Sequence, residues 1–208
     1  MSQKVVYDFV TLFVVLDPVG MLVIFLAVTA DLEPAQRRHA ALLGVTYSFV
    51  VLLFFIVAGE LLLIEMGIPL RAFQISGGIL VLLYGIEMSL GSSAPGTGTD
   101  RPTGSSINAL AVYPLAVPAI AGPGAMLTTV LLTDNRLYGF WEQTLTTVVL
   151  ALVLAIYFVI LLFANPIMKL IGIGGANVLR RVMGILLSAI AIKMVLTAFQ
   201  SWLGLPAL

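Results

Sequence analysis

The sequence predicts an all-α protein that crosses a membrane six times, and three observations support this fold class. Hydrophobic residues make up 61% of the chain and charged residues only 10%, with a mean hydropathy of +1.14. A soluble domain carries about 25% charged residues because its surface must face water. Long stretches without charge recur along the chain, and the second half repeats features of the first. The chain therefore has the composition of an integral membrane protein.

The same composition excludes several classes of function. The formal net charge is zero, so nothing indicates binding to nucleic acid. The chain has no cysteine, which excludes disulfides, thiolate metal sites and cysteine nucleophiles. Its single histidine, His39, lies in the charged stretch 31–39, outside every predicted span. We therefore expect no catalytic residue, no metal site and no cofactor.

Uncharged or nearly uncharged stretches mark six predicted spans, since a helix needs about 20 apolar residues to cross the hydrocarbon core. The first contains only Asp8 and Asp17, the third only Glu87, and the last only Lys193. The first stretch is long and continues directly into the fold, so we expect a span there and not a cleaved signal peptide. The six stretches cover residues 5–30, 40–59, 72–90, 103–133, 143–168 and 182–208.

One connector is long and rich in Gly, Ser, Thr and Pro, the composition of a flexible linker. It covers residues 91–106 and separates a first three-span repeat, residues 1–90, from a second, residues 107–208. Positive charges favour the cytoplasmic side of a membrane. The linker and the connectors on its side carry six Lys or Arg residues, against three on the opposite side. The linker is therefore expected in the cytoplasm and both termini outside it.

The two halves match after a shift of 105 or 106 residues. The informative matches are those of Gly and Pro, because apolar residues align easily by chance in such a chain. They pair Asp17-Pro18 with Gly122-Pro123, Gly67 with Gly172, and Gly78 with Gly184. Because three spans is an odd number, the second half must enter the membrane from the opposite side. The sequence thus predicts two inverted repeats, an architecture of many secondary transporters.

Proline interrupts the predicted spans at matching places in the two repeats. An interior helical position needs the N–H that proline lacks, whereas the first position of a helix accepts it, preferably after a capping residue such as Asp. Asp17-Pro18 therefore predicts a new half-helix inside the first span. The fourth span has Pro114, Pro118 and Pro123 within ten residues, which no unbroken helix accommodates.

Two interruptions at matching positions would bring two half-helix N-termini to a common centre in the membrane. Irregular backbone at that depth is tolerated only where protein or a water-filled cavity satisfies it. Helix N-termini attract anionic groups, and Asp17 could cap a helix, bind an ammonium group or carry a proton. The alternative is that these residues only kink packed helices and that Asp17 only caps one. The predicted substrate-binding residues are Asp17, Pro18, Gly20, Pro118, Gly122, Pro123 and Gly124.

Three segments resemble the MarC family of bacterial inner-membrane proteins: residues 17–20 (DPVG) followed by 24–26 (IFL), residues 113–124 (YPLAVPAIAGPG), and residues 181–184 (RVMG). The resemblance extends from about residue 7 to residue 199. It implies a six-span protein of the bacterial inner (plasma) membrane, in a family whose members have been linked to transport of small neutral amino acids such as glycine and alanine. Family members often have Asn and Pro where this chain has Met21 and Val23, and an uncharged residue, often Gln, at the position of Lys193.

Two classes of function remain open. The first is a secondary transporter for a small zwitterionic solute, with a proton or sodium ion as the coupling ion and membrane lipid as the surrounding partner. The second is an intramembrane enzyme acting on a lipid or peptide, which would need a nucleophile and base or a metal. The spans offer no His or Cys for it, and Ser188 lies on a different helix face from Lys193. A channel is the third option and would be distinguished by a flux that does not saturate. Whether the chain forms a homo-oligomer is left open.

Overall fold

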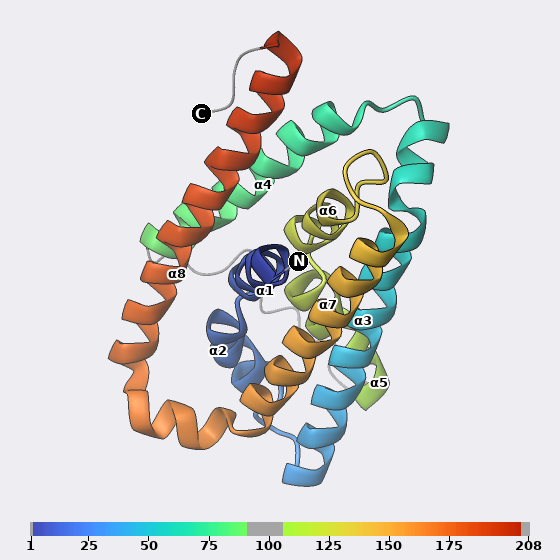
Figure 1. The fold of residues 1–208 in the computed structure, drawn as a ribbon. Coiled ribbons are helices and arrows are strands. Elements are labelled where there is room, and N and C mark those ends of the chain that lie inside the picture. The colour runs from blue at the N-terminus through green and yellow to red at the C-terminus, as the bar shows by residue number, and fades with distance from the viewer. Residues whose placement is uncertain (1, 91–105, 205–208) are drawn as a thin grey trace.

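The structure of the protein is a computed structural model that describes residues 2–90 and 106–204, and all regular secondary structure within these ranges is helical (Figure 1). The predicted linker, residues 91–106, lies outside the described residues except for Ser106. In chain order the helices are α1 (Ser2–Leu16), α2 (Pro18–Val28), α3 (Pro34–Glu65), α4 (Leu70–Leu90), α5 (Ile107–Leu110), the wider π-type helix η1 (Ala111–Ile120), α6 (Pro123–Leu132), α7 (Phe140–Leu162) and α8 (Ala164–Leu203).

Among the described residues, five helical segments are long and apolar enough to cross a membrane by themselves. A sixth span results if Ile107–Ile120 and Pro123–Leu132, whose axes differ by 61°, are taken as one bent unit. The all-helical, multi-span class predicted from the sequence is therefore confirmed. The five continuous segments are Gln3–Val28, Pro34–Glu65, Leu70–Leu90, Phe140–Leu162 and Gly174–Leu203.

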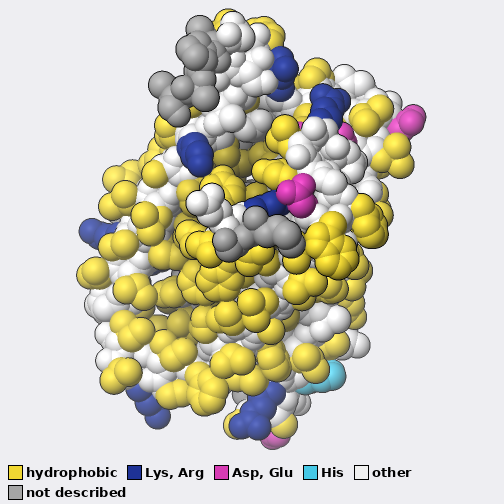
Figure 2. All heavy atoms as spheres, in the orientation of Figure 1, with side chains coloured by type: hydrophobic (Ala, Val, Ile, Leu, Met, Phe, Trp, Pro, Cys, Tyr) yellow, Lys and Arg dark blue, Asp and Glu magenta, His cyan; other side chains and the backbone are white. Residues whose placement is uncertain are grey.

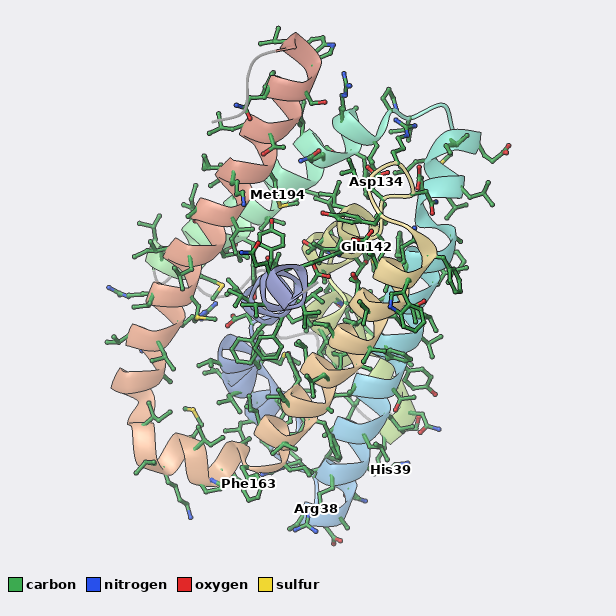
Figure 3. All side chains as sticks on the ribbon, viewed as in Figure 1. Arg38, His39, Asp134, Glu142, Phe163 and Met194 are labelled. Carbon is green, nitrogen blue, oxygen red and sulfur yellow. The ribbon has the colours of Figure 1, made fainter. Side chains whose placement is uncertain are left out.

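The surface has an apolar middle and more polar ends. Figure 2 shows hydrophobic side chains across the middle of the visible face, with basic side chains gathered near its lower edge and in its upper part. Arg38 and His39 lie at the lower end beside the turn at Phe163, whereas Asp134 and Glu142 lie toward the upper end (Figure 3). This distribution suits an apolar belt in contact with lipid and two ends in contact with water.

The first span lies at the centre of the molecule. In its most apolar window 61% of the residues are buried, compared with 22–39% in the other four continuous spans. In Figure 1, α1 and α2 lie between the pair α4 and α8 on one side and the pair α3 and α7 on the other. Asp8 and Asp17 are consequently buried, and a buried carboxylate is costly unless polar groups compensate it.

Glycines bring α4 of the first half against α8 of the second. A Cβ added to Gly85 would lie 2.9 Å from the carbonyl oxygen of Gly184, and one added to Gly184 would lie 2.7 Å from the carbonyl oxygen of Gly85. Small residues let helix backbones approach this closely in membranes. The amide of Gln74 adds a hydrogen bond of 3.0 Å to the carbonyl oxygen of Met194. Gly85, which the sequence places away from both interruptions, is therefore part of the contact between the halves.

The fifth span ends earlier than the charge pattern predicts. The uncharged stretch runs to residue 168, but α7 ends at Leu162 and the chain turns at Phe163, while Pro166 lies in the first turn of α8, where proline is tolerated. The chain then bends again at Gly172, whose φ of 68° is open mainly to glycine. Charged residues mark where a span is able to leave the membrane, whereas the turn itself requires only a backbone that can bend.

Candidate functional site

A cavity of about 450 Å³ lies between the two halves of the chain. Its walls come from α1, α2 and α4 of the first half and from η1, α6 and α8 of the second. Most of the lining side chains are apolar, and the polar groups are Tyr84, Glu87 and the backbone of a glycine-containing turn. A concave, largely apolar pocket with a few polar groups is the usual form of a small-molecule site.

The backbone of η1 departs from helical geometry on one side of the cavity. Tyr113 has φ −131° and ψ 125°, and Val117 has φ −127° and ψ 124°. Each of these residues precedes a proline, Pro114 or Pro118, through a cis peptide bond. Both prolines line the cavity.

The start of α6 also faces the cavity. Gly122 is the N-cap, Pro123 is the first helical residue, and no described side chain caps this end. Gly122, Pro123, Gly124 and Ala125 all line the cavity, so the free first turn of α6 is directed toward it. A Cβ on Gly122 would approach the carbonyl oxygen of Pro118 to 2.7 Å, which explains a glycine here. We call residues 118–124 the Gly122 junction.

The junction in the first span is built differently. Asp17 adopts the left-handed conformation, with φ 46° and ψ 65°, between the end of α1 and Pro18, the first residue of α2. Its Oδ1 accepts a hydrogen bond of 3.0 Å from the backbone N–H of Gly20. Hydrogen bonds from Asp17 N to Phe13 O and from Met21 N to Asp17 O, both 3.2 Å, continue across the junction. Residues 17–20, the Asp17 junction, therefore lie where α1 ends and α2 begins, inside the candidate span Gln3–Val28.

The second oxygen of Asp17 lacks a partner. Asp17 is 3% exposed, and its Oδ2 makes no hydrogen bond to any described residue. The buried hydroxyl of Tyr157 on α7 also has no hydrogen-bond partner among the described residues. One carboxylate oxygen of Asp17 thus accepts a hydrogen bond, and the other has no hydrogen-bond partner among the described residues.

The structure places four of the seven predicted substrate-binding residues in the cavity wall: Pro118, Gly122, Pro123 and Gly124. Asp17, Pro18 and Gly20 are buried beside the cavity without lining it, although Val15 and Ile24 on either side of them do line it. A Cβ on Gly124 would lie 3.9 Å from Val15 Cγ1, so the Gly122 junction lies against α1 two residues before Asp17.

Sequence reasoning missed the contribution of α4. Leu80, Leu83, Tyr84 and Glu87 follow the three- and four-residue spacing of one helix face, and all four line the cavity. That spacing was readable in the sequence, but only the tertiary structure turns this face toward the cavity. Glu87 is partly buried, and no described residue forms a hydrogen bond or ion pair with its carboxylate.

A second polar cluster joins the start of α1 to α6, α7 and the connection between them. Lys4 Nζ forms an ion pair of 2.8 Å with Asp8 Oδ2 and donates to Thr146 Oγ1 of α7 at 2.9 Å and to the carbonyl oxygen of Leu132 at 3.3 Å. The Thr146 hydroxyl donates to Asp8 at 2.6 Å. Lys4 also lies 4.0 Å from the centre of the Tyr138 ring, and burial, together with the charge of Asp8, raises the pKa of Tyr138. We call Lys4, Asp8, Tyr138 and Thr146 the Lys4 cluster.

The described residues contain no group of three or more His, Asp or Glu side chains arranged to hold a metal ion. The cavity instead offers a free helix start, which attracts negative charge, and the carboxylate of Glu87, which attracts positive charge. These two groups lie among apolar side chains, an arrangement suited to a solute that carries both charges.

Comparison with known proteins identifies the family. The model of the MarC family of integral membrane proteins matches residues 2–203. The chain belongs to the MarC family. It is 33% identical over 203 residues to the UPF0056 inner membrane protein YhgN of Escherichia coli strain K12, covering 97% of this chain and 98% of that protein. It is 32% identical over 199 residues to the UPF0056 membrane protein MJ1677 of Methanocaldococcus jannaschii, covering 95% and 97%.

The family assignment confirms the resemblance seen in the sequence and makes this chain a multi-pass integral membrane protein with inner-membrane relatives. A membrane protein of Buchnera aphidicola subsp. Schizaphis graminum is similar over nearly its full length as well, with 30% identity over 202 residues, 96% of this chain and 98% of that protein. No solved structure matches the chain. The relatives' names describe a membrane location, so the activity of this MarC-family chain must be argued from its own cavity.

Proposed function

We propose that the protein is a secondary transporter that moves a small zwitterionic solute, such as a neutral amino acid, by alternating access around the cavity. The observation that carries this proposal is a cavity walled by both halves of the chain, with the uncapped start of α6 directed into it. Transporters bind solutes between repeats near the middle of the membrane, where half-helix N-termini face anionic groups. Transport requires no chemical step, and we assign no enzymatic activity.

Several structural matches support two inverted repeats as the moving parts. Pro18 and Pro123 each begin a helix after the residues that align in sequence, Asp17 and Gly122. Gly67 and Gly172, also aligned, both have positive φ, of 66° and 68°. Gly78 and Gly184 likewise both lie in the α4–α8 contact.

The carboxylate of the solute would bind at the Gly122 junction. The backbone N–H groups of Gly124 and Ala125 lie in the first turn of α6, where an intrahelical acceptor is missing. The partial positive charge of the helix start adds to these donors. Glycine at positions 122 and 124 keeps the backbone accessible, since a side chain at either position would collide with neighbouring atoms.

Asp17 would serve the coupling ion, a proton or sodium. Its Oδ2 is buried beside the cavity without a partner among the described residues, and its Oδ1 accepts a hydrogen bond from the Gly20 N–H. An intramembrane carboxylate is expensive to maintain and commonly belongs to an ion or proton path. The Lys4 cluster joins the halves at the start of α1, whereas Asp17 follows the end of this helix. The contacts of the cluster would have to break when the cavity opens toward the side of the membrane on which the cluster lies.

Uptake by the purified full-length protein in liposomes tests the proposal. We expect saturable uptake of radiolabelled leucine or alanine, driven by a proton or sodium gradient. Gly122→Val and Gly124→Val should each reduce uptake at least tenfold with little loss of expression, because the added side chains would meet the carbonyl oxygen of Pro118 and Val81 Cγ2.

Gly174→Val is the matched control, because no atom lies within 4 Å of a Cβ at Gly174. Gly85→Val cannot serve, since Gly85 packs against α8. Flux that fails to saturate would indicate a channel. The proposal would be contradicted if liposomes containing the protein took up no amino acid, or if the Gly122→Val variant retained full uptake.

A further inference from the structure

We propose that Glu87 binds the ammonium group of the solute and that the apolar wall of the cavity selects neutral amino acids with large apolar side chains. This inference rests on the proposed function and narrows its substrate class. It is carried by the position of Glu87 on α4 relative to the start of α6, by the isolation of its carboxylate, and by the size and lining of the cavity.

The start of α6 packs against the part of α4 that also carries Glu87. A Cβ on Gly124 would lie 2.6 Å from Val81 Cγ2, so the free end of α6 rests on α4 at Val81. Glu87 follows six residues later, a rise of about 9 Å along the helix axis. The Cα–Cβ bonds of a helix tilt toward its N-terminus, so the Glu87 side chain leans back toward Val81.

An α-amino acid fits between these two points. Its ammonium and carboxylate groups are attached to the same carbon and therefore lie close together. A hydrogen bond of about 2.9 Å at each end lengthens the distance that the amino acid can bridge between Glu87 and α6. The carboxylate would accept from the first turn of α6 while the ammonium group donates to Glu87. This orientation gives the zwitterion a partner of opposite charge at both ends.

The isolation of Glu87 points to a cationic ligand. Within the described part of the chain, no basic side chain forms an ion pair with it. Lys193, which aligns with Glu87 in the repeat, instead lies 4.8 Å from the centre of the Tyr7 ring. A partly buried carboxylate without a permanent partner is costly, and an ammonium group would remove that cost.

The remaining space indicates a large side chain. A volume of about 450 Å³ is in the range of pockets that enclose drug-sized ligands, so glycine or alanine would leave most of it unfilled. Each buried methylene strengthens binding about fourfold, which favours leucine over alanine. The apolar wall consists of Val15, Ile24, Leu80, Leu83, Ile120 and Leu187.

Binding to the purified full-length protein tests the inference. The ligands are glycine, alanine, valine, leucine and phenylalanine, together with 4-methylvalerate, which is leucine without its ammonium group, and isoamylamine, which is leucine without its carboxylate. Isothermal titration and thermal shift should show leucine binding at least tenfold more tightly than alanine, and at least tenfold more tightly than either truncated analogue.

Glu87→Gln should weaken leucine binding at least tenfold and leave 4-methylvalerate binding unchanged, because only the ammonium contact is lost. Glu65→Gln is the matched control, since Glu65 is exposed at the end of α3, away from the cavity. The nearly isosteric amide preserves folding, which the thermal transition of the ligand-free protein verifies.

The outcomes separate the two proposals. Tightest binding of glycine or alanine would overturn the substrate class and leave the transporter proposal intact. Equal binding of leucine and 4-methylvalerate, or full leucine binding by Glu87→Gln, would overturn the role of Glu87. Binding of octanoate in preference to every amino acid would show that the cavity takes a lipid chain and overturn the inference. Failure of all amino acids in both binding and uptake would reject the transporter itself.

Discussion

At the scale of single residues, Asp17 and Glu87 show what local patterns can and cannot predict. Asp before Pro, with Gly three residues after the Asp, is a local signal for a helix start, and the structure has Asp17 as the cap of α2. Glu87 carries no local signal of function, because its place in the cavity depends on α6, which lies far away in the sequence. Local backbone chemistry was therefore predictable, whereas a side chain's neighbours across the fold were not.

Asp17→Asn separates the capping role of Asp17 from its charge. Asn caps helices about as well as Asp and tolerates the left-handed conformation, so thermal stability should change by less than about 1 kcal/mol. Gradient-driven uptake should be lost, because the coupling ion needs the carboxylate. Asp17→Ala should lose stability as well, by about 1 kcal/mol, since alanine provides no cap. Normal uptake by Asp17→Asn across a range of pH would restrict Asp17 to capping.

At the scale of helices, the Lys4 cluster shows how the first span tolerates one of its two carboxylates, that of Asp8. The sequence shows Lys4 and Asp8 one helical turn apart, a spacing that allows an ion pair. The contacts with Leu132 and Thr146 join this pair to α6 and α7 of the other half. They could not be predicted, since apolar spans of similar composition give no indication of which helices become neighbours.

Removing one partner of this ion pair should cost more than removing both. Asp8→Leu leaves Lys4 beside Thr146 without its counter-ion, and we expect a loss of about 3 kcal/mol, the lower end for buried pairs, because Lys4 lies near the helix end. The double variant Lys4→Met, Asp8→Leu should recover most of this loss by replacing both charges with apolar groups. Thermal unfolding in detergent measures the difference. A double variant less stable than Asp8→Leu would show that the pair stabilises the fold by itself.

At the scale of the whole molecule, the sequence was most informative about class and least about arrangement. Hydropathy and charge indicate how many segments can cross a membrane, and residues 2–90 and 106–204 form five such segments, or six with the bent pair counted as one. Neither quantity indicates that the first span is the most buried, which follows from how the other helices pack around it. The prolines of the fourth span predicted irregular backbone, but the cavity that this backbone lines also needs α4 and α8.

The orientation in the membrane can be tested directly because the chain contains no cysteine. Ala35 is exposed in the first turn of α3, near Arg38 at the lower end of Figure 3, and Gly139 is exposed between Asp134 and Glu142 toward the upper end. The excess of Lys and Arg on the side of Ala35 predicts that this side is cytoplasmic.

A membrane-impermeant maleimide added to intact cells should therefore label the Gly139→Cys variant, and the Ala35→Cys variant only after permeabilisation. A cysteine within residues 91–106 should behave like Ala35→Cys. The opposite labelling pattern would reverse the orientation. Labelling of both variants in intact cells would place Ala35 and Gly139 on the same side of the membrane and contradict the predicted number of crossings between α2 and α7.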